Sequence, residues 1–140
     1  MLRRLKEKEE RILQVLDELR EESAKGTPII VEGRKDTKTL RSLGIEGQLI
    51  TVKTGGKSFL DIVTGIRESD TGQVILLLDF DRRGREGTKN LKAHLERAKI
   101  KPNLTYWKKL MAMSRRDIQC VESLKNYLDT LQSKVSSLAS

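Results

Sequence analysis

The stretch Val74-Ile75-Leu76-Leu77-Leu78-Asp79-Phe80-Asp81 decides the predicted fold, because a wholly apolar run leads directly into two aspartates. A short apolar run without polar alternation is typical of a parallel strand that is buried on both faces. A second run, Ile29-Ile30-Val31, ends in the same way at Glu32. Since ligands of open parallel sheets bind outside the carboxyl ends of the strands, we expect Glu32, Asp79 and Asp81 to meet at one edge of a sheet.

Three carboxylates gathered at one edge predict a site for a hard cation. Mg²⁺ is usually held by one or two carboxylates together with phosphate oxygens, and Mn²⁺ is the alternative ion. The competing interpretation is structural. Glu32 would then cap a helix or pair with Arg34 or Lys35, and the two aspartates would end a helix in a turn.

The distribution of charge predicts a polyanionic partner. The chain has 140 residues, with 28 Lys and Arg against 20 Asp and Glu, and a net charge of +8. Between Arg82 and Arg116 there are twelve basic residues and only two acidic ones, so the rest of the chain is mildly acidic. Such a block attracts nucleic acid, although a solvated helix face is the alternative. The candidate phosphate contacts are Arg34, Lys35, Lys57, Arg82, Arg83, Arg85 and Lys89.

Composition excludes several other classes of protein. The single cysteine, Cys120, rules out an intrachain disulfide and a cysteine-rich zinc site. We find no signal peptide and no apolar run of membrane-spanning length. We therefore expect one soluble, cytoplasmic domain with no membrane contact.

Helical and strand patterns alternate along the chain, which predicts an α/β fold. The patterns predict, in order, helix 2–24, strand 29–32, helix 36–43, strand 48–53, helix 58–68, strand 73–79, helix 87–99 and strand 103–106. Right-handed crossovers would place helices on both faces of a four-stranded parallel sheet, giving three layers. The expected strand order is 2-1-3-4, because the first and third strands must be neighbours for Glu32 to meet the aspartates.

A last helix is expected from Ser114, with Asp117 completing a cap like a capping box. It carries an apolar seam at Val121, Leu124, Leu128, Leu131, Val135 and Leu138. The first helix offers a similar stripe at Leu5, Ile12, Leu16 and Leu19. These stripes either complete the core of a monomer or pair with a second subunit or a protein partner. Tyr106 and Trp107, at the end of the fourth strand, are interpreted as core residues, with base stacking as the alternative.

Two motifs together resemble the Toprim domain, namely Val31-Glu32-Gly33-Arg34-Lys35-Asp36 and Leu78-Asp79-Phe80-Asp81-Arg82-Arg83-Gly84. The resemblance covers about 27–106 and implies a Rossmann-like three-layer fold. We expect an N-terminal helix over 1–26, a Toprim core over 27–110 and a C-terminal helix over 111–140. The chain resembles small stand-alone Toprim proteins of archaea and bacteria, with no topoisomerase or primase domains attached.

The resemblance also implies a function. Glu32 matches the family glutamate that serves as general base or acid, and Asp79 and Asp81 match the aspartates that coordinate Mg²⁺. Arg83 stands where many type IA topoisomerases have a further acidic residue, which implies weaker metal binding without substrate. The implied activity is Mg²⁺-dependent phosphodiester chemistry, as a nuclease or in phosphoryl transfer. RNA is favoured over DNA as the substrate, because the motifs are most similar to those of the nucleases that mature ribosomal RNA. The alternatives are a non-catalytic nucleic-acid or ribosome-binding module and a subunit of a larger nucleic-acid-processing machine.

Overall fold

The computed structural model describes residues 1–52, 59–69 and 71–140. Its elements, in chain order, are α1 (Leu2–Ala24), β1 (Ile29–Val31), α2 (Arg34–Ser42), β2 (Leu49–Thr51), α3 (Phe59–Glu68), β3 (Gln73–Leu76), α4 (Arg82–Arg97), β4 (Lys101–Asn103), α5 (Thr105–Ser114), the 3₁₀ turn η1 (Val121–Ser123) and α6 (Leu124–Ala139). The alternation confirms the predicted α/β class. None of the helices in these described ranges is both long enough and apolar enough to cross a membrane.

The four strands form one parallel sheet in the order β2-β1-β3-β4, as predicted. Ile29 in β1 pairs with Leu49 on one side and with Ile75 on the other. Strands β1 and β3 are therefore direct neighbours, and their carboxyl ends lie side by side. This pairing is what brings the residue after β1 close to the residues after β3.

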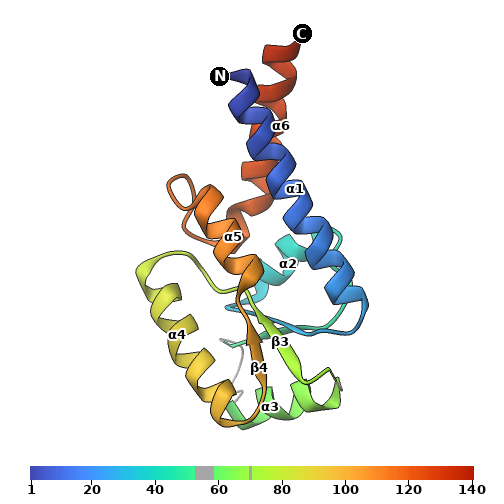
Figure 1. Ribbon diagram of the computed structural model, residues 1–140, viewed down its shortest axis with the longest axis vertical. Helices are drawn as coiled ribbons and strands as arrows, with labels where there is room; N and C mark the ends of the chain where they lie inside the picture. The colour runs from blue at the N-terminus through green and yellow to red at the C-terminus, as the bar shows by residue number, and fades with distance from the viewer. Residues whose placement is uncertain (53–58, 70) are drawn as a thin grey trace.

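Helices cover both faces of the sheet, and the strand residues alternate between two cores (Figure 1). Ile29, Val31, Ile75 and Leu77 pack into the core formed with α1, α2, α5 and α6. The intervening strand residues pack into a second core with α3 and α4, namely Ile30, Val74, Leu76 and Leu78. The architecture therefore has the three layers expected, and the apolar residues of the two central strands, β1 and β3, are all buried on one face or the other.

The two terminal helices pack against each other. Figure 1 shows α1 and α6 running antiparallel and extending beyond the sheet, with both chain termini at the same end. The seam residues Leu124, Leu128 and Leu131 are buried in one cluster with Ile12 and Leu16 of α1. The apolar stripe of α6 is thus covered within one chain from Val121 to Val135, in agreement with core completion, whereas Leu138 at its end is 48% exposed.

Two helices begin earlier than predicted. Helix α2 begins at Arg34 because the Asp36 carboxylate accepts a hydrogen bond from the Gly33 backbone N–H at 3.0 Å, which closes its first turn. Helix α4 begins at Arg82, five residues before the predicted start, because Asp81 is its N-cap. Both residues therefore serve helix starts as well as lying near the predicted site.

The prediction for the segment after β4 was wrong in two respects. Strand β4 is Lys101–Asn103, and Tyr106 and Trp107 belong to helix α5 rather than to a strand. Trp107 is buried and donates from Nε1 to the Leu78 carbonyl oxygen at 2.8 Å, which ties α5 to the sheet. Ser114 ends α5 instead of starting the last helix, and its hydroxyl bonds back to the preceding turn.

Candidate functional site

Glu32 and Asp79 meet at the carboxyl ends of β1 and β3. Glu32 directly follows β1, and Asp79 lies just beyond β3. Their side chains share a hydrogen bond. The expectation that the sheet brings these two carboxyl groups together is therefore confirmed.

Asp79 has a strongly perturbed pKa. Burial is the largest cause that raises this pKa from its ordinary value of 3.8 to about 7, and the hydrogen bond and charge of Glu32 and the charge of Asp36 act in the same sense. The backbone N–H of Val121 acts in the opposite direction, donating to Asp79 Oδ1 at 3.0 Å. Without a cation, the Glu32–Asp79 pair thus favours keeping a proton near neutral pH.

A third acid, Asp36, lies close enough to act on this pair, although it is not among the predicted site residues. Asp36 is 6% exposed and accepts hydrogen bonds from the backbone N–H groups of Gly33 and Glu122. Burial is the largest cause that raises its pKa, and the Glu32 charge adds to the shift. The site is therefore more acidic than the three predicted residues alone indicate.

The segment before α6 forms part of the site, which the sequence did not reveal. The Phe80 backbone N–H donates to the Gln119 carbonyl oxygen at 2.8 Å, and Val121 binds Asp79 as described. Thr39 of α2 donates from Oγ1 to the Glu122 carbonyl oxygen at 3.0 Å. These contacts hold η1 against the acid pair at the sheet edge.

Asp81 has a different local role. Its Oδ1 accepts the Gly84 backbone N–H at 2.7 Å, which caps α4. Across the described ranges, no three His, Cys, Asp or Glu side chains are gathered as a complete metal cluster. The structure therefore presents a carboxylate pair, and the assignment of all three predicted acids to one ion stays a prediction.

The donor set nevertheless fits Mg²⁺. The paired carboxyl groups hold a proton mainly because Asp79 is partly buried, and the charge of Glu32 adds to this effect, so a divalent cation in the same place would offset the buried negative charge. Magnesium commonly takes only one or two carboxylates and completes its shell with water and substrate phosphate. Asp79 with Glu32 would supply the protein ligands, and the outer oxygen of Asp81 would be a further one.

The predicted cations differ in how they are placed. Arg83 lines a cleft of about 450 Å³ together with Glu32, between the sheet edge and helices α3 and α4. Arg85 instead donates to the Phe80 carbonyl oxygen at 2.7 Å, and Arg82 pairs with Glu86 at 3.2 Å on an exposed surface. The other predicted contacts are Arg34, Lys35 and Lys89, which are exposed, and Lys57, which lies outside the described residues.

Gly84 is required for packing beside the site, which yields a stability prediction. A Cβ at Gly84 would lie 2.1 Å from the Asp79 carbonyl oxygen, so Gly84→Ala must push α4 away from the strand end. We expect a loss of about 2 kcal/mol in the free energy of unfolding, measured by urea denaturation. Gly87→Ala in the same helix is the matched control, because its Cβ would meet only Leu78 Cδ1 at 3.7 Å. That change should stabilise by up to about 1 kcal/mol through helix propensity, and equal effects at both positions would contradict the packing argument.

The raised Asp79 pKa predicts a pH dependence of stability in the absence of metal. In the unfolded chain this carboxyl ionises near pH 4, whereas in the folded chain it does so near pH 7. Between these values the folded state holds the extra proton, so stability falls as pH rises and levels off above about pH 7. In EDTA, wild type should lose more stability than Asp79→Asn between pH 5 and pH 8, by chemical denaturation. Parallel curves for the two proteins would show that the pair does not share a proton.

Comparison with known proteins identifies the family of this chain. The family model for the Toprim domain matches residues 27–106. A UPF0292 protein of Methanosarcina barkeri is 35% identical over 126 residues, which cover 89% of this chain and 85% of that protein. A UPF0292 protein of Methanocaldococcus jannaschii is 36% identical over 121 residues, covering 86% of this chain and 91% of the relative.

A solved structure of a protein from Aquifex aeolicus has a similar fold, with a TM-score of 0.67 and 26% sequence identity, covering 79% of this chain and 94% of that one. The matched range 27–106 contains the whole sheet together with Glu32, Asp79 and Asp81. Membership of this family connects the acid pair with metal-dependent chemistry related to nucleic acids. The chain belongs to the Toprim domain family and is similar in sequence to the archaeal UPF0292 proteins.

Proposed function

We propose that this protein carries out Mg²⁺-dependent phosphodiester chemistry on nucleic acid, by cleavage or phosphoryl transfer, with RNA ahead of DNA as substrate. The observation that carries the proposal is the Glu32–Asp79 pair at the carboxyl ends of β1 and β3, with a proton held near neutral pH. When a divalent cation displaces this proton and binds Asp79, the adjacent carboxyl group of Glu32 can exchange a proton with a reacting oxygen. The pair also provides hard oxygen ligands of the kind that Mg²⁺ takes in phosphoryl-transfer sites.

The residues have separate roles in this proposal. Asp79 is the main ligand for Mg²⁺, which when bound neutralises phosphate charge and lowers the pKa of a bound water. Glu32 faces the cleft that Arg83 also lines, so it is placed to take or give a proton at the substrate oxygen. Arg83 brings a positive charge to the same cleft, where negative charge develops on the phosphorus oxygens.

Two backbone hydrogen bonds and one short chain connection keep the pair in place. Val121 N–H fixes one oxygen of Asp79, and the Phe80–Gln119 hydrogen bond fixes the chain on the other side of it. Glu32 has only the single residue Gly33 between itself and helix α2. Because both carboxyl groups are attached to short, well-anchored segments, little ordering is needed when substrate binds.

The proposal is tested by incubating purified protein with end-labelled structured RNA, single-stranded RNA and DNA. Parallel reactions contain Mg²⁺, Mn²⁺ or EDTA, and products are resolved on denaturing gels. We expect new products with either metal and none with EDTA. Products that persist in EDTA would contradict a metal-dependent reaction, whereas unchanged but bound nucleic acid would favour the non-catalytic binding module.

A further inference from the structure

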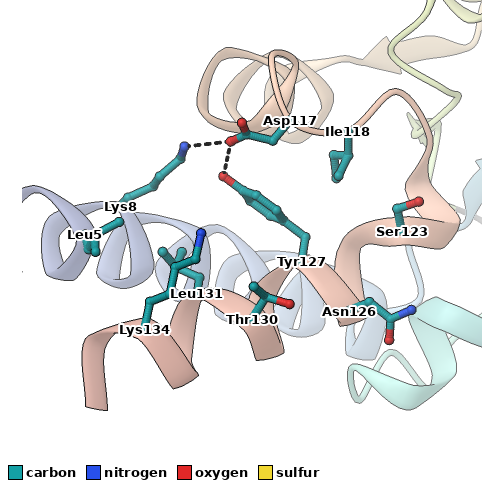
Figure 2. Close-up of a pocket in the computed structure, with 10 residues that line it drawn as sticks. All are labelled: Leu5, Lys8, Asp117, Ile118, Ser123, Asn126, Tyr127, Thr130, Leu131 and Lys134. Carbon is teal, nitrogen blue, oxygen red and sulfur yellow. Dashed lines mark hydrogen bonds and ion pairs between the residues drawn. The ribbon is translucent and has the colours of Figure 1, made fainter. Parts of the chain in front are cut away.

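A second cleft lies between the terminal helices, away from the acid pair. It has a volume of about 550 Å³ and is formed by α1, α6 and the loop that follows α5. Figure 2 shows Lys8 of α1 and Lys134 of α6 extending into the space next to Asp117 and Tyr127. We call this hollow the terminal-helix cleft, and it lies outside the range that the Toprim family model matches.

A fixed network holds the carboxylate that lines the cleft. Asp117 Oδ2 accepts hydrogen bonds from Tyr127 Oη at 2.7 Å and from Lys8 Nζ at 3.1 Å (Figure 2). The Lys8 ammonium also lies 5.5 Å from the centre of the Tyr127 ring. These two hydrogen bonds lower the pKa of Asp117. The negative charge of this carboxylate is therefore partly neutralised by the committed hydrogen bonds from Tyr127 and Lys8, so it repels an incoming anion less than an isolated aspartate does.

Further cations adjoin this network. A neighbouring hollow of about 450 Å³ shares Lys8 and Asp117 and adds Lys108, Arg115 and Arg116 to its lining. In the part of the chain that the structure describes, no carboxylate pairs with Lys108, Arg115, Arg116 or Lys134, and all four are exposed. The two hollows thus form one surface on which five cations surround the committed Asp117 carboxylate.

The surface lies within a short reach of the acid pair. Four residue steps separate Asp117 from Val121, whose N–H binds Asp79. An extended chain spans at most about 3.6 Å per residue, so these steps cover about 14 Å at most. Phosphates along one strand of a duplex advance by about 3.4 Å each, so about four of them cover that span. A strand with a reacting phosphate at Asp79 would therefore have its neighbouring phosphates near this surface.

We propose that the terminal-helix cleft and its basic extension bind the phosphate backbone of the nucleic acid whose reacting segment lies at Glu32 and Asp79. This inference rests on the proposed function for its choice of polyanion. A small anion would engage one or two of these cations, whereas regularly spaced phosphates engage cations from α1, α6 and the loop after α5 together. Asn126 and Thr130 on α6 add amide and hydroxyl groups of the kind that contact phosphate and sugar.

The test is equilibrium binding in EDTA, which separates binding from any reaction. Fluorescence anisotropy is measured with labelled single strands of about 16 nucleotides, as RNA and as DNA of the same sequence, between 50 and 200 mM salt. The cleft variants are Arg115→Ala/Arg116→Ala and Lys134→Ala. The matched control is Lys25→Ala/Lys101→Ala, which removes two exposed charges near the amino ends of β1 and β4.

The expected result is a smaller salt dependence for the cleft variants only. For single strands the log–log slope falls by about 0.7 for each phosphate that the protein no longer neutralises, so the double variant should show a slope smaller by about 1.4. RNA and DNA should show the same decrease, because both carry the phosphate. An equal decrease in the control would overturn the inference, since net charge alone would explain it, and so would a wild type that binds neither polymer. The wild type could also show no reaction with any nucleic acid in Mg²⁺ while the slope decreases only in the cleft variants. That result would contradict the proposed phosphodiester chemistry but would support phosphate binding at the terminal-helix cleft.

Discussion

Asp79→Asn is expected to abolish metal-dependent activity, by about 10³-fold or more, while leaving the protein folded. The variant removes the charge that would hold Mg²⁺ but keeps the shape of the side chain and its acceptor oxygen for Val121 N–H. Loss of an essential group of this kind removes nearly all of the rate that depends on the ion. The measurement is the initial rate of product formation in Mg²⁺, with circular dichroism to show that the fold is kept.

The same rate measurement on variants of Glu32 and Asp81 separates the roles of these two acids. Glu32→Gln should lose about 10²- to 10⁴-fold in rate, as expected for a general acid or base. Asp81→Asn should lower activity without lowering stability, because asparagine caps a helix as well as aspartate does. Glu86→Gln is the matched control, since Glu86 is exposed on α4 and pairs only with Arg82 among the residues described. A Glu32→Gln protein with the full rate would remove the acid–base role from this residue.

Neutralising Asp79 should also raise stability in the absence of metal. At pH 8 the wild-type site holds Glu32, Asp79 and Asp36 close together, and like charges there oppose folding. Asp79→Asn removes one of these charges, so the free energy of unfolding in EDTA should be equal to or greater than that of wild type. An inactive variant that is also clearly less stable would point to a structural role for Asp79 in binding Val121.

The sheet and the acid pair were predictable because both depend on local patterns. The two apolar runs before Glu32 and Asp79 are long enough to identify buried parallel strands, and parallel strands deliver their carboxyl ends to one edge. The neighbouring positions of β1 and β3 then followed from the requirement that Glu32 meet the aspartates, and the observed strand order and the hydrogen-bonded pair agree with it.

The helix starts were harder to predict because glycine has two uses. The helix after the third strand was predicted to begin only at Gly87, because glycines at 84 and 87 are typical of a loop, whereas both lie inside α4. Gly84 stands there because the helix packs so closely on the Asp79 carbonyl oxygen that no Cβ fits. A single sequence does not distinguish a glycine that loosens a loop from one that permits close packing.

The hydrogen-bond partners from the C-terminal segment could not be predicted from the sequence for a different reason. Val121 N–H and the Gln119 carbonyl oxygen act through the backbone, so no residue type marks them. They also come from about 40 residues away in the chain, across a helix, α5, that the pattern did not predict. Asp36 is an acidic residue that the sequence does show, but a carboxylate at the start of a helix is sufficiently explained by helix capping. Tertiary contacts alone show that it belongs to the site.

Leu124→Glu/Leu131→Glu is expected to unfold the protein. Both leucines lie in the core shared by α1, α2 and α6, at 1% and 5% exposure, with no basic side chain buried beside them in that cluster of described residues. Two carboxylates placed there would each cost several kcal/mol through lost hydration. A domain of this size is stable by only about 5–15 kcal/mol in total, so the two changes together should exceed it.

The matched control for this variant is Leu60→Glu/Leu138→Glu, which makes the same chemical change at leucines that are 71% and 48% exposed. We expect this control to fold normally, since neither side chain loses much burial. Light scattering coupled to size-exclusion chromatography gives the mass of each protein, and circular dichroism gives its helix content. A monomeric wild type with an unfolded core variant supports packing of α6 within one chain. A dimeric wild type that becomes a folded monomer in the core variant would instead make the α6 seam a subunit interface, and the antiparallel pairing of α1 with α6 would then have to form between chains.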